Sequence, residues 1–108
     1  MWTRGFASAV ALAALASAQD AALVVLSKGA ETLSIVDPTS YRVLATVKTG
    51  TDPHEVAVTT DGAWAFVSNY GPGGQGNTIS IIDLKARTGR VVDLGEHHGI
   101  HAIGVLDG

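Results

Sequence analysis

The sequence predicts an all-β domain built from a repeated unit of short strands, and three observations support this. The segment Thr-Leu-Ser-Ile-Val-Asp at residues 32–37 recurs as Thr-Ile-Ser-Ile-Ile-Asp at residues 78–83. Short runs of Val, Ile, Leu, Thr and Ala alternate with turn residues such as Asp61-Gly62, as in an antiparallel meander. A long helical pattern is confined to the first residues of the chain, so strands account for the remainder.

The repeat covers more than this pair of segments and keeps its order. Three further segments return: residues 24–27 as 65–68, residues 54–58 as 101–105, and residues 61–62 as 107–108. Repeat periods near 40–50 residues, built from four short strands, are typical of β-propeller blades. We therefore expect a partial β-propeller of about two four-stranded antiparallel blades, with repeat copies at residues 22–62 and 63–108.

Three strings carry a resemblance to a known family: Phe-Val-Ser-Asn-Tyr-Gly at residues 66–71, Asn-Thr-Ile-Ser-Ile-Ile-Asp at 77–83, and Asp-Pro-His-Glu-Val-Ala-Val-Thr-Thr-Asp-Gly at 52–62. In these strings the chain resembles the YVTN-type β-propeller repeat of exported bacterial and archaeal proteins. Its motifs are structural, so the resemblance implies a fold and leaves the activity open. The first copy departs from the pattern, with Lys28-Gly29-Ala30 where the second copy has Asn69-Tyr70-Gly71.

The resemblance also implies a strand order. The segment after His54 is the innermost strand of a blade, and the strands containing Val67, Ile81 and Val92 follow outward. The segment from His101 then begins the innermost strand of another blade. A ring needs at least four blades, so we expect the chain to be the N-terminal piece of a longer protein. The alternative is a short protein that completes a ring by homo-oligomerisation.

Residues 1–18 have the features of a secretory signal. Arg4 supplies a positive charge, residues 6–16 form an apolar stretch, and Ala16-Ser17-Ala18 provides small residues before a cut ahead of Gln19. The alternative is a membrane anchor, but the apolar run is shorter than the roughly 20 residues that a span requires. We expect a periplasmic or extracellular domain at residues 19–108, with no membrane span after cleavage.

Composition excludes several function classes. The 108 residues carry a formal charge of −3 with no basic run, so nucleic acid is not an expected partner. The absence of cysteine excludes disulfides, a cysteine zinc site and a thiol nucleophile. No Gly-x-Ser-x-Gly sequence marks a serine nucleophile. Residues 71–76 match the spacing of a dinucleotide-binding loop, but a strand rather than a helix follows, so we interpret them as a flexible hairpin connection.

Histidines form the one group with potential metal chemistry. The candidate ligands are His54, His98 and His101, with His97 beside them, and imidazoles suit copper or zinc. His54 and His101 occupy equivalent repeat positions and would lie near the mouth of the propeller channel. The alternative, which a repeated residue favours, is that these side chains pack or hydrogen-bond at blade junctions.

Three other residues have a structural and a functional interpretation. Asp37 and Asp83 end equivalent strands, so we expect them to accept turn hydrogen bonds rather than to act as paired acid–base carboxylates. Trp64 is expected to pack between blades rather than to stack on a ligand.

The favoured function is therefore non-enzymatic. It is an exported scaffold whose loops bind a protein, a surface polymer or a small molecule, with no catalytic residue and no cofactor predicted. Two alternatives remain open: a lactonase-like or metal-dependent propeller enzyme with histidines at the channel mouth, and an electron-transfer copper protein.

Overall fold

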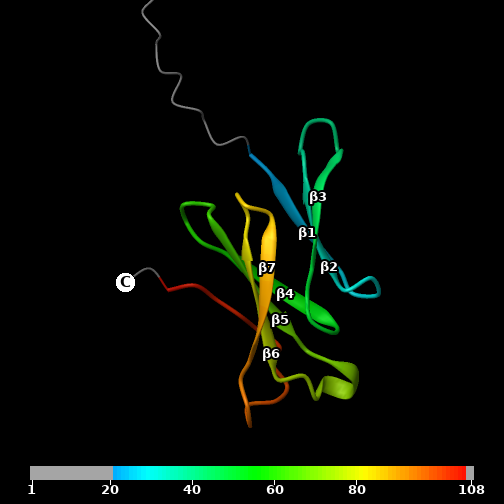
Figure 1. Cartoon of the computed structure of the whole chain (residues 1–108), viewed down its shortest axis with the longest axis vertical. Helices are drawn as coiled ribbons and strands as arrows, with labels where there is room; N and C mark the ends of the chain where they lie inside the picture. Colours follow the sequence, from blue (N-terminus) through cyan, green and yellow to red (C-terminus); the bar gives the residue numbers. More distant parts are fainter. Residues whose placement is uncertain (1–20, 107–108) are drawn as a thin grey trace, which may run out of the picture.

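The computed structural model describes residues 21–106 as two antiparallel β-sheets (Figure 1). The first has the order β1 (Leu23–Ser27), β2 (Thr32–Val36), β3 (Val43–Lys48). The second has the order β4 (Pro53–Val58), β5 (Trp64–Asn69), β6 (Thr78–Asp83), β7 (Thr88–Asp93), with a short 3-10 helix η1 (Pro72–Gly74) between β5 and β6. The expected export signal at residues 1–18 and the Asp107-Gly108 turn lie outside the described residues.

Both sheets are simple meanders, because each strand pairs with the strand that precedes it within its sheet. The two serine–isoleucine repeats fall on β2 and β6, in separate sheets, as expected for successive blades. The prediction of an all-β fold with propeller-type blades is confirmed. No helix within residues 21–106 is long and apolar enough to cross a membrane.

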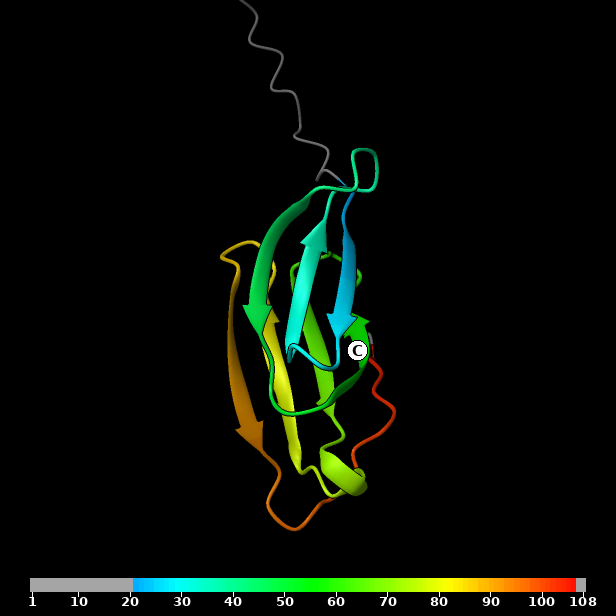
Figure 2. The same cartoon turned by 90° about the vertical axis from the view of Figure 1, so that its right-hand side faces the viewer.

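The sheets stack face to face, with β1 against β4 and β3 against β7 (Figure 2). The core between them is formed by six buried side chains: Leu33, Ile35 and Val47 from the first sheet, and Ala65, Val67 and Ile82 from the second. Burial of this apolar surface is the main favourable contribution to the packing of one sheet on the other.

Equivalent strands contribute opposite faces to this core. On β2, Leu33 and Ile35 point into the interface, whereas β6 turns Ser80 and Ile82 inward. Because side chains alternate along a strand, Ile79 and Ile81, the repeat partners of Leu33 and Ile35, lie on the far face. A unit that stacks between two neighbours needs both faces apolar, and this accounts for the nearly continuous apolar sequence of β6.

Trp64 also lies on that far face, because its neighbour Ala65 points into the core. Trp64 is 41% exposed and does not pack between these two sheets; on the far face it lies where a further blade would pack, so the expected blade packing stays a prediction. A shallow hollow of about 200 Å³ lies beside it; its lining residues are Trp64, Ile81, Asp83, Thr88, Gly89 and Arg90.

The turns after β2 and β6 are copies of one another. In each, the aspartate Oδ1 accepts backbone N–H groups two and three residues further on, at 2.7 and 3.2 Å for Asp37 and at 3.0 and 2.8 Å for Asp83. Each turn closes at a residue of positive φ, 59° at both Tyr41 and Arg87. This is the structural role that the repeat predicts for the two aspartates.

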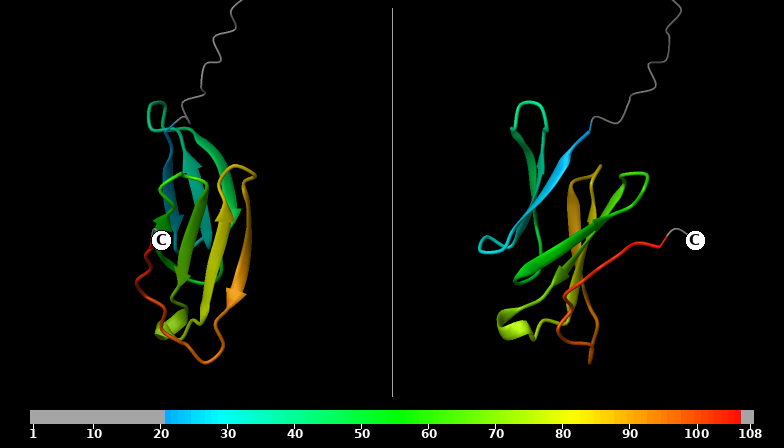
Figure 3. Two further views of the ribbon diagram at one scale, coloured as in Figure 1. Left: turned by 90° about the vertical axis from the view of Figure 1, so that its left-hand side faces the viewer. Right: turned by 180° about the vertical axis from the view of Figure 1, so that it is seen from behind.

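One expected strand is missing. Residues 101–105, predicted to be an innermost strand, belong to neither sheet and run away from the second sheet (Figure 3, red). An innermost strand pairs with the second strand of its own blade, and no such strand exists among residues 21–106. Within the described residues, the repeat sequence therefore occurs without the paired strand that would make it part of a sheet.

Candidate functional site

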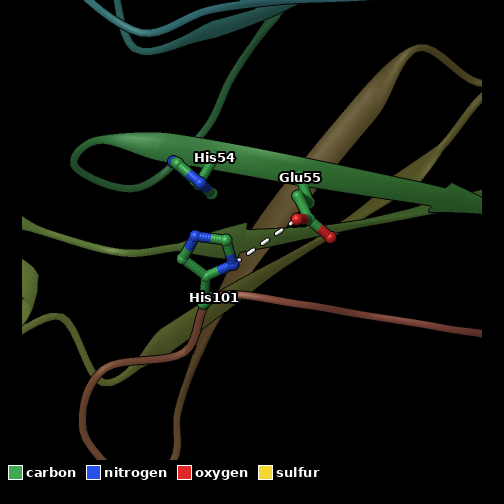
Figure 4. A group of neighbouring side chains, drawn as sticks. All are labelled: His54, Glu55 and His101. Atoms are coloured by element: carbon green, nitrogen blue, oxygen red, sulfur yellow. Dashed lines mark ion pairs between the residues drawn. The ribbon is translucent and has the colours of Figure 1, made fainter.

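A β-bulge at the start of β4 directs two consecutive side chains to one place. Pro53 pairs with Asn69 and Glu55 pairs with Ser68, which are consecutive on β5. His54 lies between Pro53 and Glu55 and therefore has no paired residue of its own on β5. Successive side chains of a regular strand point to opposite faces, and a bulge removes this alternation locally. His54 and Glu55 therefore lie beside the same third residue, His101 (Figure 4).

The glycine-rich insert between β5 and β6 holds the segment that brings His101 back to β4. The Gly99 N–H donates to the Gly76 carbonyl at 2.9 Å, and Asn77 Nδ2 donates to the Gly95 carbonyl at 2.9 Å. The insert thus has a positioning role that its sequence did not indicate.

Ser68 joins the two chain segments that meet at the site. Its hydroxyl donates to the His101 carbonyl at 2.7 Å and accepts the Glu55 N–H at 3.1 Å. Ser68 is fully buried, so water does not compete for these hydrogen bonds. A single side chain of β5 therefore fixes the backbone on which both Glu55 and His101 stand.

Three rings pack together at the site. The ring centroids of His54 and His101 lie 4.1 Å apart, and the Tyr70 ring lies 5.3 Å from each. Tyr70 is accommodated by Gly74, where a Cβ atom would lie 2.5 Å from the phenol oxygen. Gly74 also has φ of 70°, a conformation that glycine adopts without strain.

The site presents nitrogen and oxygen donors to solvent. His101 Nδ1 and Glu55 Oε1 are 3.4 Å apart, with side chains 55% and 43% exposed. One potential ligand atom from each of His54, Glu55 and His101 lies within 4.8 Å of the others. Of the three histidines proposed from the sequence, two meet here.

His98 does not join them. Its Nδ1 lies 3.0 Å from the carbonyl oxygen of Gln75, on the insert. The third potential ligand beside His54 and His101 is Glu55, whereas the sequence predicted His98. Glu55 was not a candidate from the sequence: in a regular strand its side chain would lie on the face opposite His54, and no feature of the sequence indicates the bulge that changes this.

A second carboxylate close in sequence is already paired. Asp52 Oδ1 lies 3.2 Å from Lys28 Nζ, and the Asp52 side chain is only 17% exposed. Lys28 is one of the residues in which the first copy departs from the repeat. Its ion pair connects the first sheet to the residue that precedes β4. Glu55 is the carboxylate left facing the two imidazoles.

No protein-family model matches the sequence, and no curated protein is significantly similar to it. Among solved structures, the chain is similar to the hydrazine synthase of Kuenenia stuttgartiensis, a protein that contains β-propeller domains. The TM-score is 0.61 at 21% sequence identity, over 77% of this chain and 22% of that one. The similarity supports the propeller fold, and the chain spans less than a quarter of that protein's length.

Proposed function

We propose that this chain forms blades of an exported YVTN-type β-propeller that acts as a binding scaffold. Its partner would be a protein, a surface polymer or a small molecule, held by a loop surface made of His54, residues 71–76 and residues 97–101. The observation that carries the proposal is the convergence of these three segments. The Gly99–Gly76 hydrogen bond and the His54–His101 ring contact join segments that are far apart in sequence.

Propeller loops suit this role because rigid sheets position them while their own sequences are free to vary. The repeated motifs form the strands and turns of both copies. The Gly71–Gly76 insert and the His97-His98 pair, by contrast, belong to the second copy alone, and they gather at one end of its sheet (Figure 1). Sequence that departs from a structural repeat is where a specific partner is expected to bind.

The test is a binding panel with the full chain immobilised and three probes: soluble peptidoglycan fragments, an acidic exopolysaccharide and a set of extended peptides. We expect one class to bind with a Kd below about 100 µM, and Gln75→Ala or His98→Ala to weaken it by about tenfold. Lys85→Ala is the matched control, because Lys85 lies in the β6–β7 turn at the opposite end of the sheet. Equal weakening by Lys85→Ala, or no binding by any class, would contradict the proposal.

Export has its own test. Expressed in a bacterial host with a periplasm, the chain should accumulate there with Gln19 as its first residue, as N-terminal sequencing would show. A protein retained in the cytoplasm with residues 1–18 intact would contradict the export proposal and leave the binding proposal standing.

A second candidate is a lactonase-like or metal-dependent propeller enzyme. The observation in its favour is the Glu55–His101 pair at 3.4 Å, because a carboxylate beside an imidazole can orient it to accept a proton from water. This function predicts hydrolysis of a simple lactone that His101→Ala abolishes and His97→Ala leaves intact. Absence of hydrolysis across a lactone panel, with and without added Zn²⁺, would favour the scaffold.

A further inference from the structure

We propose that His54, Glu55 and His101 form a binding site for a divalent transition-metal ion of the Zn²⁺ type. The two imidazoles and the carboxylate supply three ligands, and water completes the coordination from the solvent side. The proposal concerns a bound ion, so it holds whether the propeller is a scaffold or an enzyme.

The donor set selects the class of ion. Two imidazole nitrogens with one carboxylate oxygen are borderline donors that suit zinc and its first-row neighbours. Calcium and magnesium take oxygen ligands almost exclusively, so a site with two nitrogen donors disfavours them. Three protein ligands also leave a coordination position open to water, as in zinc sites that exchange a ligand.

The distances fit such an ion. Zinc bonds of about 2.0–2.2 Å in a tetrahedral arrangement keep neighbouring ligand atoms about 3.4 Å apart. His101 Nδ1 and Glu55 Oε1 already have that separation, at 3.4 Å. The remaining ligand separations are at most 4.8 Å, so a modest rotation of the His54 side chain about its torsions brings the third donor into range.

The backbone around the ligands is held in place before an ion arrives. The Ser68 hydroxyl bridges the Glu55 N–H and the His101 carbonyl, and the Tyr70 ring flanks both imidazoles. Binding therefore requires side-chain adjustment without ordering of the chain, and this lowers its entropic cost.

The His54 imidazole is also available to bind an ion. Within residues 21–106 its imidazole has ring neighbours but no hydrogen-bond partner. The Glu55 carboxylate lies beside both rings, with Oε1 3.4 Å from His101 Nδ1 and one ligand atom of each residue within 4.8 Å of the others. A cation in the space between the three side chains would give His54 a partner and neutralise Glu55 at the same time.

The experiment uses the full chain, purified without a polyhistidine tag and stripped with a chelator. Zn²⁺ is titrated by calorimetry, and Co²⁺ serves as the spectroscopic probe because its visible absorption reports nitrogen and oxygen coordination of low symmetry. We expect one ion per chain with a Kd in the micromolar range or tighter. Each of His54→Ala, Glu55→Gln and His101→Ala should weaken Zn²⁺ binding at least about tenfold.

His97→Ala and His98→Ala are the matched controls, because each removes an exposed histidine from the same loop surface without touching the three ligands. Circular dichroism confirms that every variant keeps its β-sheet signal. Zn²⁺ binding that is absent in the parent chain, or equally weakened by the two controls, would overturn the proposal. Binding of Ca²⁺ with an affinity equal to that of Zn²⁺ would also overturn it.

Discussion

The two sheets carry the same repeat and differ in where its polar residues go. Strands β2 and β6 end in identical aspartate turns, and both sheets supply three side chains to the shared core. In the second sheet, however, Ser80 and Asn69 are buried, whereas the first copy has exposed Lys28 at the position equivalent to Asn69. The two copies thus share strands and turns, and they differ in the polar residues that join one sheet to the other.

Buried polar residues of the second sheet hydrogen-bond to the segment that connects the two sheets. Asn69 Nδ2 donates to Ser80 Oγ at 3.0 Å and to Thr78 Oγ1 at 3.1 Å. Ser80 Oγ in turn accepts the Gly50 N–H at 2.9 Å, on the segment that leads from β3 to β4. A Cβ atom at Gly50 would lie 2.4 Å from Asn69 Nδ2, so this approach needs glycine. The first sheet has an ion pair, Lys28 with Asp52, in a corresponding place.

The largest expected effects test the opposite use of equivalent faces. Leu33→Ala and Ile82→Ala each remove a fully buried side chain from the core, at a cost of about 2–5 kcal/mol of unfolding free energy. Their repeat partners Ile79 and Val36 lie on the far faces, so Ile79→Ala and Val36→Ala should cost about 1 kcal/mol or less. Urea unfolding followed by circular dichroism measures all four.

These measurements need a protein concentration at which sedimentation shows a monomer, because a second copy could cover the far faces. Under that condition, equal losses for Leu33→Ala and Ile79→Ala would mean that the two strands do not use opposite faces. Equal losses that appear only in an oligomer would instead support ring completion by self-association.

An intermediate effect is expected where the two copies diverge. Asn69→Ala leaves the buried hydroxyl of Ser80 and the partly buried hydroxyl of Thr78 without one partner, which costs about 1–3 kcal/mol. Lys28→Ala removes a partly exposed ion pair, worth about 0–1 kcal/mol. The same unfolding assay compares the two variants. A larger loss of unfolding free energy for Lys28→Ala than for Asn69→Ala would contradict this prediction, because the ion pair would then stabilise the protein more than the buried hydrogen bonds do.

The fold was largely readable from the sequence because repeated strands carry repeated apolar and turn residues. The repeated segments at residues 32–37 and 78–83 contain β2 and β6, which lie in separate sheets, as the 46-residue offset predicts. The exception is informative: residues 101–105 match residues 54–58 in sequence but form no strand. Local sequence favours an extended chain, whereas a strand also requires a neighbour, and that neighbour is not specified locally.

The site was readable only in part, for a related reason. The repeat identified His54 and His101 because equivalent positions come to equivalent places. Glu55 was missed because a bulge, which has no sequence signal here, brings it to the side of His54. Ser68 belongs to a repeated strand segment, so nothing in its sequence context sets it apart, yet its hydroxyl joins Glu55 to His101.

The smallest expected effect concerns acid and should be alike in both sheets. Hydrogen bonds donated by the Thr39 and Ser40 N–H groups lower the pKa of Asp37 below its usual value of 3.8. The Thr59 hydroxyl and the Ala63 N–H do the same to the pKa of Asp61 in the second sheet. Because the folded state holds each carboxylate in its charged form, the resulting stability is present above the unfolded pKa and is lost as pH falls through the folded one.

Asp37→Asn and Asp61→Asn keep an acceptor oxygen in each turn and remove only the charge. Each variant should therefore be slightly less stable than the parent at neutral pH, and its stability should decline less between about pH 5 and pH 3. Both carboxylates are exposed, so solvent screens them and the differences will be small shifts in Tm. Parent and variants with identical acid profiles would show that the turns are held by their backbone geometry alone. A response in only one variant would mean that the carboxylate of the other turn does not stabilise the folded state.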